Sequence, residues 1–277
     1  MDILLDTVID NLKLFPFLLI TYLFLEYLEH KTSDKTANII SKARKSGPLI
    51  GSLCGTLPQC GFSVVAANFY AARVIGLGTL IAVFLSTSDE MLPILISNAV
   101  SLWLIIAILA YKAVCGIIFG YLINFIWHKY RKTENINIEQ LCQDENCHCE
   151  DGIFKSALHH SLRITLFIFI ITLMLNFAVA YLDIKQLATY LQIPLLGEIF
   201  SAVIGLIPNC SASVILTQLF LDGYINIGTL ISGSLVSSGV GILVLFRVNR
   251  RLKENFSIIG IICICGIIGG LFSNLVF

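Results

Sequence analysis

Hydrophobic residues in this chain gather in long blocks that are separated by short polar segments. A helix needs about 20 apolar residues to cross a bilayer, and most of the blocks reach that length. The pattern therefore predicts an all-α polytopic membrane protein. The blocks lie at roughly 12–28, 48–72, 75–97, 99–127, 162–182, 194–221, 225–247 and 256–277.

One stretch of the chain is echoed 150 positions later without a gap. Residues 55–88 read GTLPQCGFSVVAANFYAARVIGLGTLIAVFLSTS, and residues 205–238 read GLIPNCSASVILTQLFLDGYINIGTLISGSLVSS. Paired Pro/Gly interruptions in the two halves of a membrane chain point to the substrate site of a transporter. The expected division is a first membrane repeat at 1–127, a cytoplasmic linker at 128–161 and a second membrane repeat at 162–277.

The basic residues are confined to a few segments. Most of the 18 Lys and Arg residues fall within 31–45, 129–163 and 247–253, which the positive-inside rule places in the cytoplasm. The segments at the equivalent places of the other half carry no net charge, because 183–185 holds one acid and one base and 97–101 holds neither. The halves are therefore expected to be inverted repeats in the inner or plasma membrane, with both termini outside.

This orientation restricts how each repeat crosses the bilayer. Segments 46–98 and 186–246 must each cross an odd number of times, yet each contains two apolar blocks. Either one block is a re-entrant hairpin or the two blocks make three short crossings, and the sequence leaves both open. Both solutions break the helix near Pro58 and Pro208, and such backbone is tolerated at membrane depth only where protein or water satisfies it. A buried, hydrated centre is expected where the two breaks meet.

Each copy of the break carries similar side chains. Proline opposes a helix, and the ends of half-helices expose polar groups that bind ions. Thiolates suit soft cations and thiophilic metalloids, while amides and hydroxyls add oxygen ligands. The simpler alternative is a kinked helix packed against small residues. The candidate metal ligands are Gln59, Cys60, Ser63, Asn209, Cys210 and Ser213, with Pro58 and Pro208 as the structural breaks.

A second polar break lies at 86–90 and contains Asp89 and Glu90, whereas its counterpart at 236–240 lacks both acids. Carboxylates inside a membrane are costly and are functional candidates by default. These two could complete a site for a divalent cation or relay protons. A solvated surface loop is the equally supported alternative.

Lys112 lies deep inside an apolar block, where its side chain cannot easily reach water. It is a candidate both for a structural ion pair, with Asp89, Glu90 or Glu198, and for coupling transport to an ion gradient.

Other polar residues inside the blocks have simpler explanations. Glu198 is expected at the membrane interface, and Arg73 and Asp222 are expected in solvent at the ends of broken blocks. The cysteines expected to act as small packing residues are Cys54, Cys115, Cys263 and Cys265.

The linker contains a compact tract of metal-binding residue types, Cys142, Cys147, His148 and Cys149. Such composition is typical of metal capture, although the spacing matches no standard zinc site. A reduced linker without metal is the alternative of similar weight.

The P-x-C-[GS]-x-S motif, followed by G-T-L-I and a Ser/Thr-rich break in both halves, resembles the ten-helix heavy-metal exporter family of bacteria, whose members are labelled arsenic efflux proteins or manganese transporters. More distantly, the chain resembles arsenical permeases. The resemblance implies efflux of a metal or metalloid and carries over to Pro58, Cys60, Ser63, Pro208, Cys210 and Ser213. Gly61 stands where the second half has Ser211, so that serine contact is not shared.

Composition agrees with a membrane protein, because 57% of the residues are hydrophobic and 13% are charged, against about 25% charged in soluble domains. The chain has no Walker A motif and no recognised catalytic motif, which argues against an ATP-driven pump or an enzyme.

The expected function is a secondary-type transporter that exports a heavy metal or metalloid, with no cofactor and with the transported ion as substrate. Its expected partners are the lipid bilayer and that ion, not nucleic acid, and a homo-oligomer is left open. The alternatives are a manganese exporter, a membrane enzyme or lipid-handling protein with an intramembrane polar site, and a metal sensor built on the linker tract.

Overall fold

The computed structural model describes residues 7–9, 12, 15–16, 18–20, 23, 46–57, 61–88, 91–128, 153–180, 191–193 and 195–277. All regular structure in these ranges is helical, which confirms the all-α prediction for them. The helices of the first half are an unlabelled helix at 46–55, α3 (Gly61–Ala71), α4 (Leu77–Ser86), α5 (Met91–Ser97) and α6 (Leu102–His128). The later helices are α8 (Ile153–Ala180), α10 (Leu196–Gly205), α11 (Cys210–Leu221), α12 (Ile227–Val236), α13 (Gly241–Val248) and α14 (Leu252–Val276).

Four stretches within the described ranges are long and apolar enough to cross a membrane. Two are continuous helices, α6 and α14, and they leave large apolar side chains uncovered, including Trp103 at 80% exposure and Leu275 at 82%. Helices that are apolar on all faces are typical of membrane spans, where lipid covers the outer face. The other two stretches, 77–97 and 227–248, each contain a break.

These breaks recur at corresponding places in the two halves. The chain leaves the helix between α4 and α5, and again between α12 and α13, 150 positions later. A further break separates α10 from α11 at 206–209, around Pro208, as the motif predicts. The matching motif of the first half, Pro58-Gln59-Cys60, lies outside the described residues.

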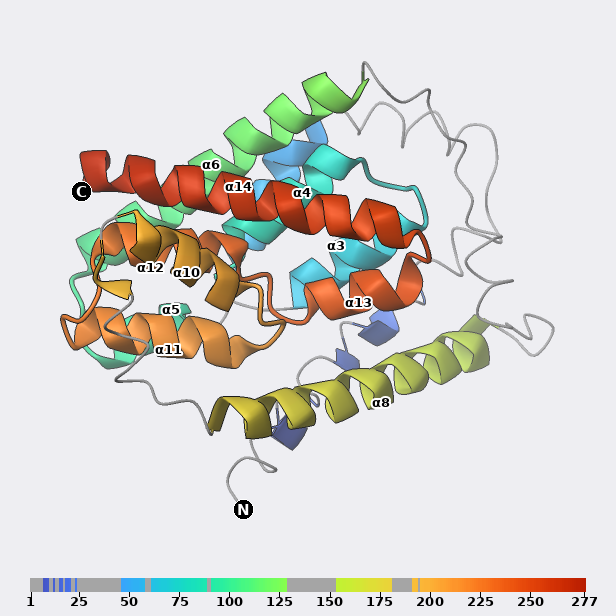
Figure 1. Ribbon diagram of the computed structural model, residues 1–277. Helices are drawn as coiled ribbons and strands as arrows, with labels where there is room; N and C mark the ends of the chain where they lie inside the picture. Colours follow the sequence, from blue (N-terminus) through green and yellow to red (C-terminus); the bar gives the residue numbers. More distant parts are fainter. Residues whose placement is uncertain are drawn as a thin grey trace.

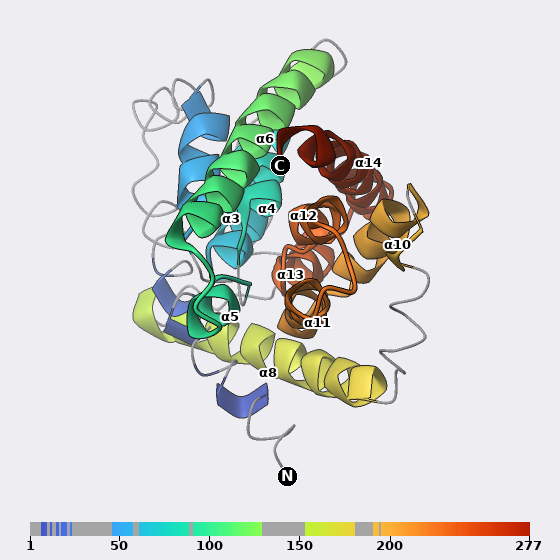
Figure 2. The same cartoon turned by 90° about the vertical axis from the view of Figure 1, so that its left-hand side faces the viewer.

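The contacts between helices are reciprocal. Within the halves, α4 packs on α6 as α12 packs on α14, and the helix at 46–55 packs on α4 as α10 packs on α12. Between the halves, α3 packs on α13 while α11 packs on α5, so each contact has its counterpart with the halves exchanged (Figures 1 and 2). This exchange is what a two-fold relation between the halves would produce.

The centre of the molecule is formed by α4 and α12. Every residue of α4 is buried, as are nine of the ten residues of α12. Large side chains of α4 such as Phe84 and Leu85 are fully buried and belong to the main hydrophobic cluster with Ile231 and Leu235 of α12. The two central helices therefore hold their broken ends away from both water and lipid.

The long helix α8 lies to one side of this bundle and contacts α13 (Figure 1). The Arg247 guanidinium of α13 lies 5.6 Å from the centre of the Phe167 ring of α8. The helix begins at Ile153, within the segment that the sequence assigned to the linker.

Candidate functional site

The Lys112 side chain joins α6 to the ends of both central helices. It is 1% exposed. Its Nζ atom donates to the carbonyl oxygen of Thr87, the C-cap of α4, and to that of Ser234, in the last turn of α12, at 2.8 Å. Carbonyl groups in a last helical turn lack helical partners and carry partial negative charge, so they are natural ligands for a cation. One ammonium group thus occupies the place where the two broken helices end together.

The hydroxyl groups around these ends differ between the halves. In the first half Thr87 Oγ1 donates to the Val83 carbonyl at 2.7 Å, and Ser88 Oγ donates to the Thr56 carbonyl at 3.1 Å. In the second half Ser237 and Ser238 are buried, and neither hydroxyl has a hydrogen-bond partner. Buried polar groups without partners are costly, so the second break is the place where an additional polar group or ion would be stabilised.

The predicted ligands of the second motif are gathered at the start of α11. Asn209 is the N-cap residue in extended backbone, and its amide donates to Ser211 Oγ at 3.1 Å. Cys210 is 9% exposed, and the Ser213 hydroxyl donates to the Cys210 carbonyl at 2.8 Å. The three candidate side chains therefore lie together in the interior, beside the break that Pro208 introduces.

Ser63, the counterpart of Ser213, lies in a different setting. It is fully buried on α3, and a Cβ atom built on Gly241 would be 2.8 Å from the Ser63 Cβ. Gly241 begins α13, so Ser63 faces the second break directly. Ser63 therefore lies beside the break that contains the unpartnered hydroxyls of Ser237 and Ser238. The Ser213 hydroxyl instead donates a hydrogen bond within its own helix, α11.

Several predicted site residues lie outside the described residues: Pro58, Gln59, Cys60, Asp89, Glu90, Cys142, Cys147, His148 and Cys149. Within the described ranges, no cluster of three or more His, Cys, Asp or Glu side chains is placed to hold a metal ion. A metal site made only of described residues would therefore depend on thiols in pairs, or on hydroxyl, amide and carbonyl oxygens.

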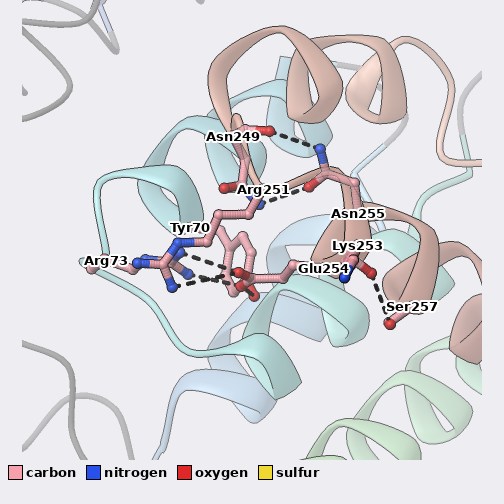
Figure 3. A network of polar contacts seen from close by, with 8 residues as sticks. All are labelled: Tyr70, Arg73, Asn249, Arg251, Lys253, Glu254, Asn255 and Ser257. Atoms are coloured by element: carbon pink, nitrogen blue, oxygen red, sulfur yellow. Dashed lines mark hydrogen bonds and ion pairs between the residues drawn. The ribbon is translucent and has the colours of Figure 1, made fainter.

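The expectation that Arg73 lies in solvent is wrong. Arg73 is 9% exposed, and its guanidinium pairs with Glu254 in the first turn of α14 (Figure 3). Tyr70 also donates its hydroxyl to the Glu254 carboxylate, and the Arg73 guanidinium lies 5.3 Å from the centre of the Tyr70 ring. A partner on a distant helix, rather than water, satisfies this charge. Asp222 is exposed, as expected.

Glu198, which was expected at the membrane interface, is enclosed by protein instead of facing solvent. Glu198 is 1% exposed between α10, α12 and α14. Its Oε1 accepts a hydrogen bond from the Asn274 amide at 3.0 Å, and its Oε2 has no partner. The helices of the second half enclose this carboxylate. Its counterpart in the first half is Pro48, so the first half has no equivalent acid.

A second repeated motif escaped the sequence analysis. Residues 115–124 read CGIIFGYLIN and residues 265–274 read CGIIGGLFSN, which share C-G-I-I-x-G-x-x-x-N at the same offset of 150. Most of the motif serves packing. A Cβ atom on Gly120 would be 2.8 Å from the Gly78 carbonyl oxygen, and one on Gly270 would be 2.8 Å from that of Gly228. Extending the alignment beyond residues 88 and 238 would have revealed the motif.

A helical multi-pass chain of two similar halves, with broken helices that end together on buried polar groups, has the architecture of a membrane transport protein. The chain belongs to the family described as "Putative, 10TM heavy-metal exporter", whose model matches residues 1–150. The matched part includes the first copy of the repeat, both of its breaks and Lys112. No curated protein and no solved structure matches the chain.

Proposed function

We propose that the chain is a secondary transporter that exports a heavy-metal or metalloid ion from the cytoplasm by alternating access between its two halves. Family membership supports the heavy-metal cargo. The observation that carries the mechanism is the position of Lys112, whose ammonium group bonds the carbonyl groups of Thr87 and Ser234 where two broken helices end. A cation binding there would have to displace or replace a cation that the protein itself supplies.

The reciprocal contacts support an inverted-repeat arrangement. In Figure 1 α6 runs from left to right and α14 runs from right to left, as expected of equivalent helices with opposite orientations. The basic residues Arg247, Arg250, Arg251 and Lys253 precede α14, and Lys129 and Arg131 follow α6, so both basic groups would lie on the same, cytoplasmic side. Rocking of α3 against α13, and of α11 against α5, would open the centre to either side.

Lys112 is the proposed coupling residue. Two unit charges 4 Å apart repel by about 4 kcal/mol at the effective dielectric constant of about 20 that suits partly buried sites. A cargo cation entering beside the Lys112 ammonium would therefore favour release of a proton, and departure of the cargo would favour its return. Among the described titratable groups, Cys115 on α6 interacts electrostatically with Lys112. Cys115 in turn interacts with Tyr111 on α6 and with Cys265 on α14.

Two ligand sets separate the cargo options. A soft cargo would be held by Cys210 with Cys60, and the oxygen atoms of Asn209, Gln59, Ser213 and Ser63 would complete the site. A hard cargo such as manganese would need Asp89 and Glu90. If Cys60→Ser with Cys210→Ser leaves arsenite tolerance intact, the thiol site at the Pro-x-Cys motifs is excluded; if Asp89→Asn leaves manganese tolerance intact, the carboxylate site is excluded.

The function is tested with inside-out vesicles from a metal-sensitive strain that expresses the chain. An exporter would accumulate its cargo in such vesicles, and a panel of arsenite, an organoarsenical, manganese, zinc and cadmium would identify the class. Lys112→Met should abolish accumulation. Lys112→Gln keeps a hydrogen-bond donor but no charge, and should retain the folded protein while uncoupling accumulation from a pH gradient. Accumulation by Lys112→Gln with the pH dependence of the wild type would rule out the coupling role.

We propose that the linker tract, Cys142, Cys147, His148 and Cys149, captures the ion before transport. Deletion of residues 140–151 should then raise the external concentration needed for half-maximal tolerance without abolishing export. Complete loss of export by a stably inserted deletion variant would contradict this auxiliary role.

A further inference from the structure

Cys115 and Cys265 occupy equivalent positions on the two long membrane helices. They begin the two copies of the repeated C-G-I-I motif and are 7% and 6% exposed. Each lies close to the middle of its helix, α6 or α14, so in a spanning helix each thiol would be near the centre of the bilayer. A pair of equivalent thiols at this depth is a different feature from the cysteines of the Pro-x-Cys motifs.

The two helices meet where these cysteines lie. Tyr111, one turn before Cys115, donates its hydroxyl to the Gly269 carbonyl of α14 at 2.6 Å. A Cβ atom built on Gly269 would be 3.7 Å from the Cys115 Sγ, and Gly269 follows Cys265 by four residues on the same helical face. The Cys115 and Cys265 thiols are close enough to interact electrostatically. The pair therefore spans the contact between the halves.

Polar groups lie near the pair in addition to its packing contacts. Both cysteines are free thiols. Lys112 lies one turn from Cys115 and interacts with it electrostatically. Gly266, next to Cys265, packs against Val236, immediately before the buried and unpartnered hydroxyls of Ser237 and Ser238. The unpartnered hydroxyls of Ser237 and Ser238 therefore come directly after α12, the helix against which Gly266 packs.

We propose that Cys115 and Cys265 form a dithiol subsite for a trivalent, thiophilic metalloid beside Lys112. With a trivalent organoarsenical bearing two hydroxyl groups, each S–H bond and each As–OH bond break, two As–S bonds form, and the protons and hydroxides leave as two water molecules. Arsenic keeps its oxidation state, so no oxidant or reductant is required. The subsite rests on the proposed export function and adds to it a second thiol binding site, at the contact of α6 and α14.

The test uses phenylarsine oxide and the purified full-length chain. The protein is treated with the reagent, digested under acidic conditions and searched by mass spectrometry for an arsenic bridge between the peptides that contain Cys115 and Cys265. Cys263→Ser is the matched control, because Cys263 lies two residues from Cys265 and is half-buried. The bridge should form in the wild type and in Cys263→Ser, and it should be absent from Cys115→Ser and Cys265→Ser.

Tolerance of a sensitive strain to phenylarsine oxide provides the second readout. Cys115→Ser and Cys265→Ser should each lower the tolerated concentration at least several-fold, while Cys263→Ser should match the wild type. Cys115→Ala and Cys265→Ala, checked for monodispersity in detergent, separate thiol loss from misfolding. If the arsenic bridge forms but the wild type gives no tolerance to phenylarsine oxide, the subsite stands and organoarsenical export is refuted. If export occurs without the bridge, or if Cys263→Ser loses tolerance as well, the subsite is refuted.

Discussion

Arg73 and Glu254 form a two-point ion pair that joins α3 of the first half to α14 of the second. Arg73 Nη1 lies 2.9 Å from Glu254 Oε1, and Nη2 lies 3.3 Å from Oε2. Arg73 has a backbone φ of 61°, in the left-handed region that glycine prefers, and its counterpart in the repeat is Gly223 with a φ of 76°. The pairing with Glu254 therefore compensates a backbone conformation that is unfavourable for arginine.

Removing either partner of this pair should destabilise the fold. Glu254→Gln and Arg73→Gly are each expected to cost about 3 kcal/mol, because a buried charge loses its partner, although Arg73→Gly regains part of the backbone cost. The thermal unfolding midpoint in detergent would measure the loss. The double variant should be more stable than the sum of the two single changes predicts, since neither charge remains.

Arg251 supplies the control for this prediction. It is about half exposed and lies 3.9 Å from Glu254 Oε2. Exposed pairs contribute about 0–1 kcal/mol, so Arg251→Gln should barely move the midpoint. Equal effects of Arg251→Gln and Arg73→Gly would mean that general charge, not the buried pair, stabilises this end of the molecule.

The close packing of α10 on α12 gives a second prediction. A Cβ atom on Gly205 would lie 2.3 Å from the Gly233 carbonyl oxygen, and backbone cannot move aside as a side chain can. Gly205→Ala should lower stability by about 1–3 kcal/mol, the usual cost of overpacking. Gly260→Ala is the control, because its Cβ would meet nothing within 4 Å and alanine favours a helix by about 1 kcal/mol over glycine. Unfolding midpoints that fall equally in both variants would contradict this account.

The break at Pro208 was predictable because proline removes a hydrogen-bond donor and disfavours helix at the preceding residue, a purely local effect. The structure accordingly separates α10 from α11 around that residue. The partner of Arg73 could not be predicted in this way, since Glu254 lies 181 positions away and its spacing carries no local signal. The burial of Glu198 could not be predicted for the same reason, because burial of a single carboxylate depends on how α12 and α14 pack over it.

The doubled motif at Cys115 and Cys265 was detectable but was missed. The two copies of the repeat diverge strongly between 89–101 and 239–251, where the first copy has acids and the second has basic residues. Identity returns only where glycines must let α6 approach α4 and α14 approach α12. The role of Lys112 was only partly predictable. Its position deep inside an apolar block could be read from the sequence, but its carbonyl partners could not, because they belong to the ends of two separate helices.

The buried Glu198 gives a third prediction. An ionised carboxylate with one bare oxygen at 1% exposure is costly without a cation. Glu198→Gln removes the charge and keeps an acceptor for the Asn274 amide, so its unfolding midpoint should equal or exceed that of the wild type. Glu198→Ala should lower the midpoint, because the Asn274 amide loses its partner. A midpoint for Glu198→Gln as low as that of Glu198→Ala would contradict this account.

The reciprocal helix contacts allow the position of Lys112 to be exchanged between the halves. Its counterpart in the repeat is Ile262 on α14, which is fully buried. If a two-fold relates the halves, a lysine at 262 would reach the carbonyl groups of Ser237 and Phe84, the counterparts of Thr87 and Ser234. Lys112→Ile should abolish export, and Ile262→Lys alone should lower the unfolding midpoint, because two ammonium groups would share one interior.

The double variant Lys112→Ile with Ile262→Lys tests whether the lysine can act from either half. It restores one ammonium group at the meeting of the helix ends, so it should recover part of the export activity in inside-out vesicles and most of the midpoint. Lys112→Ile with Ile262→Leu is the matched control and should recover neither. A folded double variant with no more export than Lys112→Ile would show that the two halves are not interchangeable at this site, and that Lys112 depends on contacts present only in the first half.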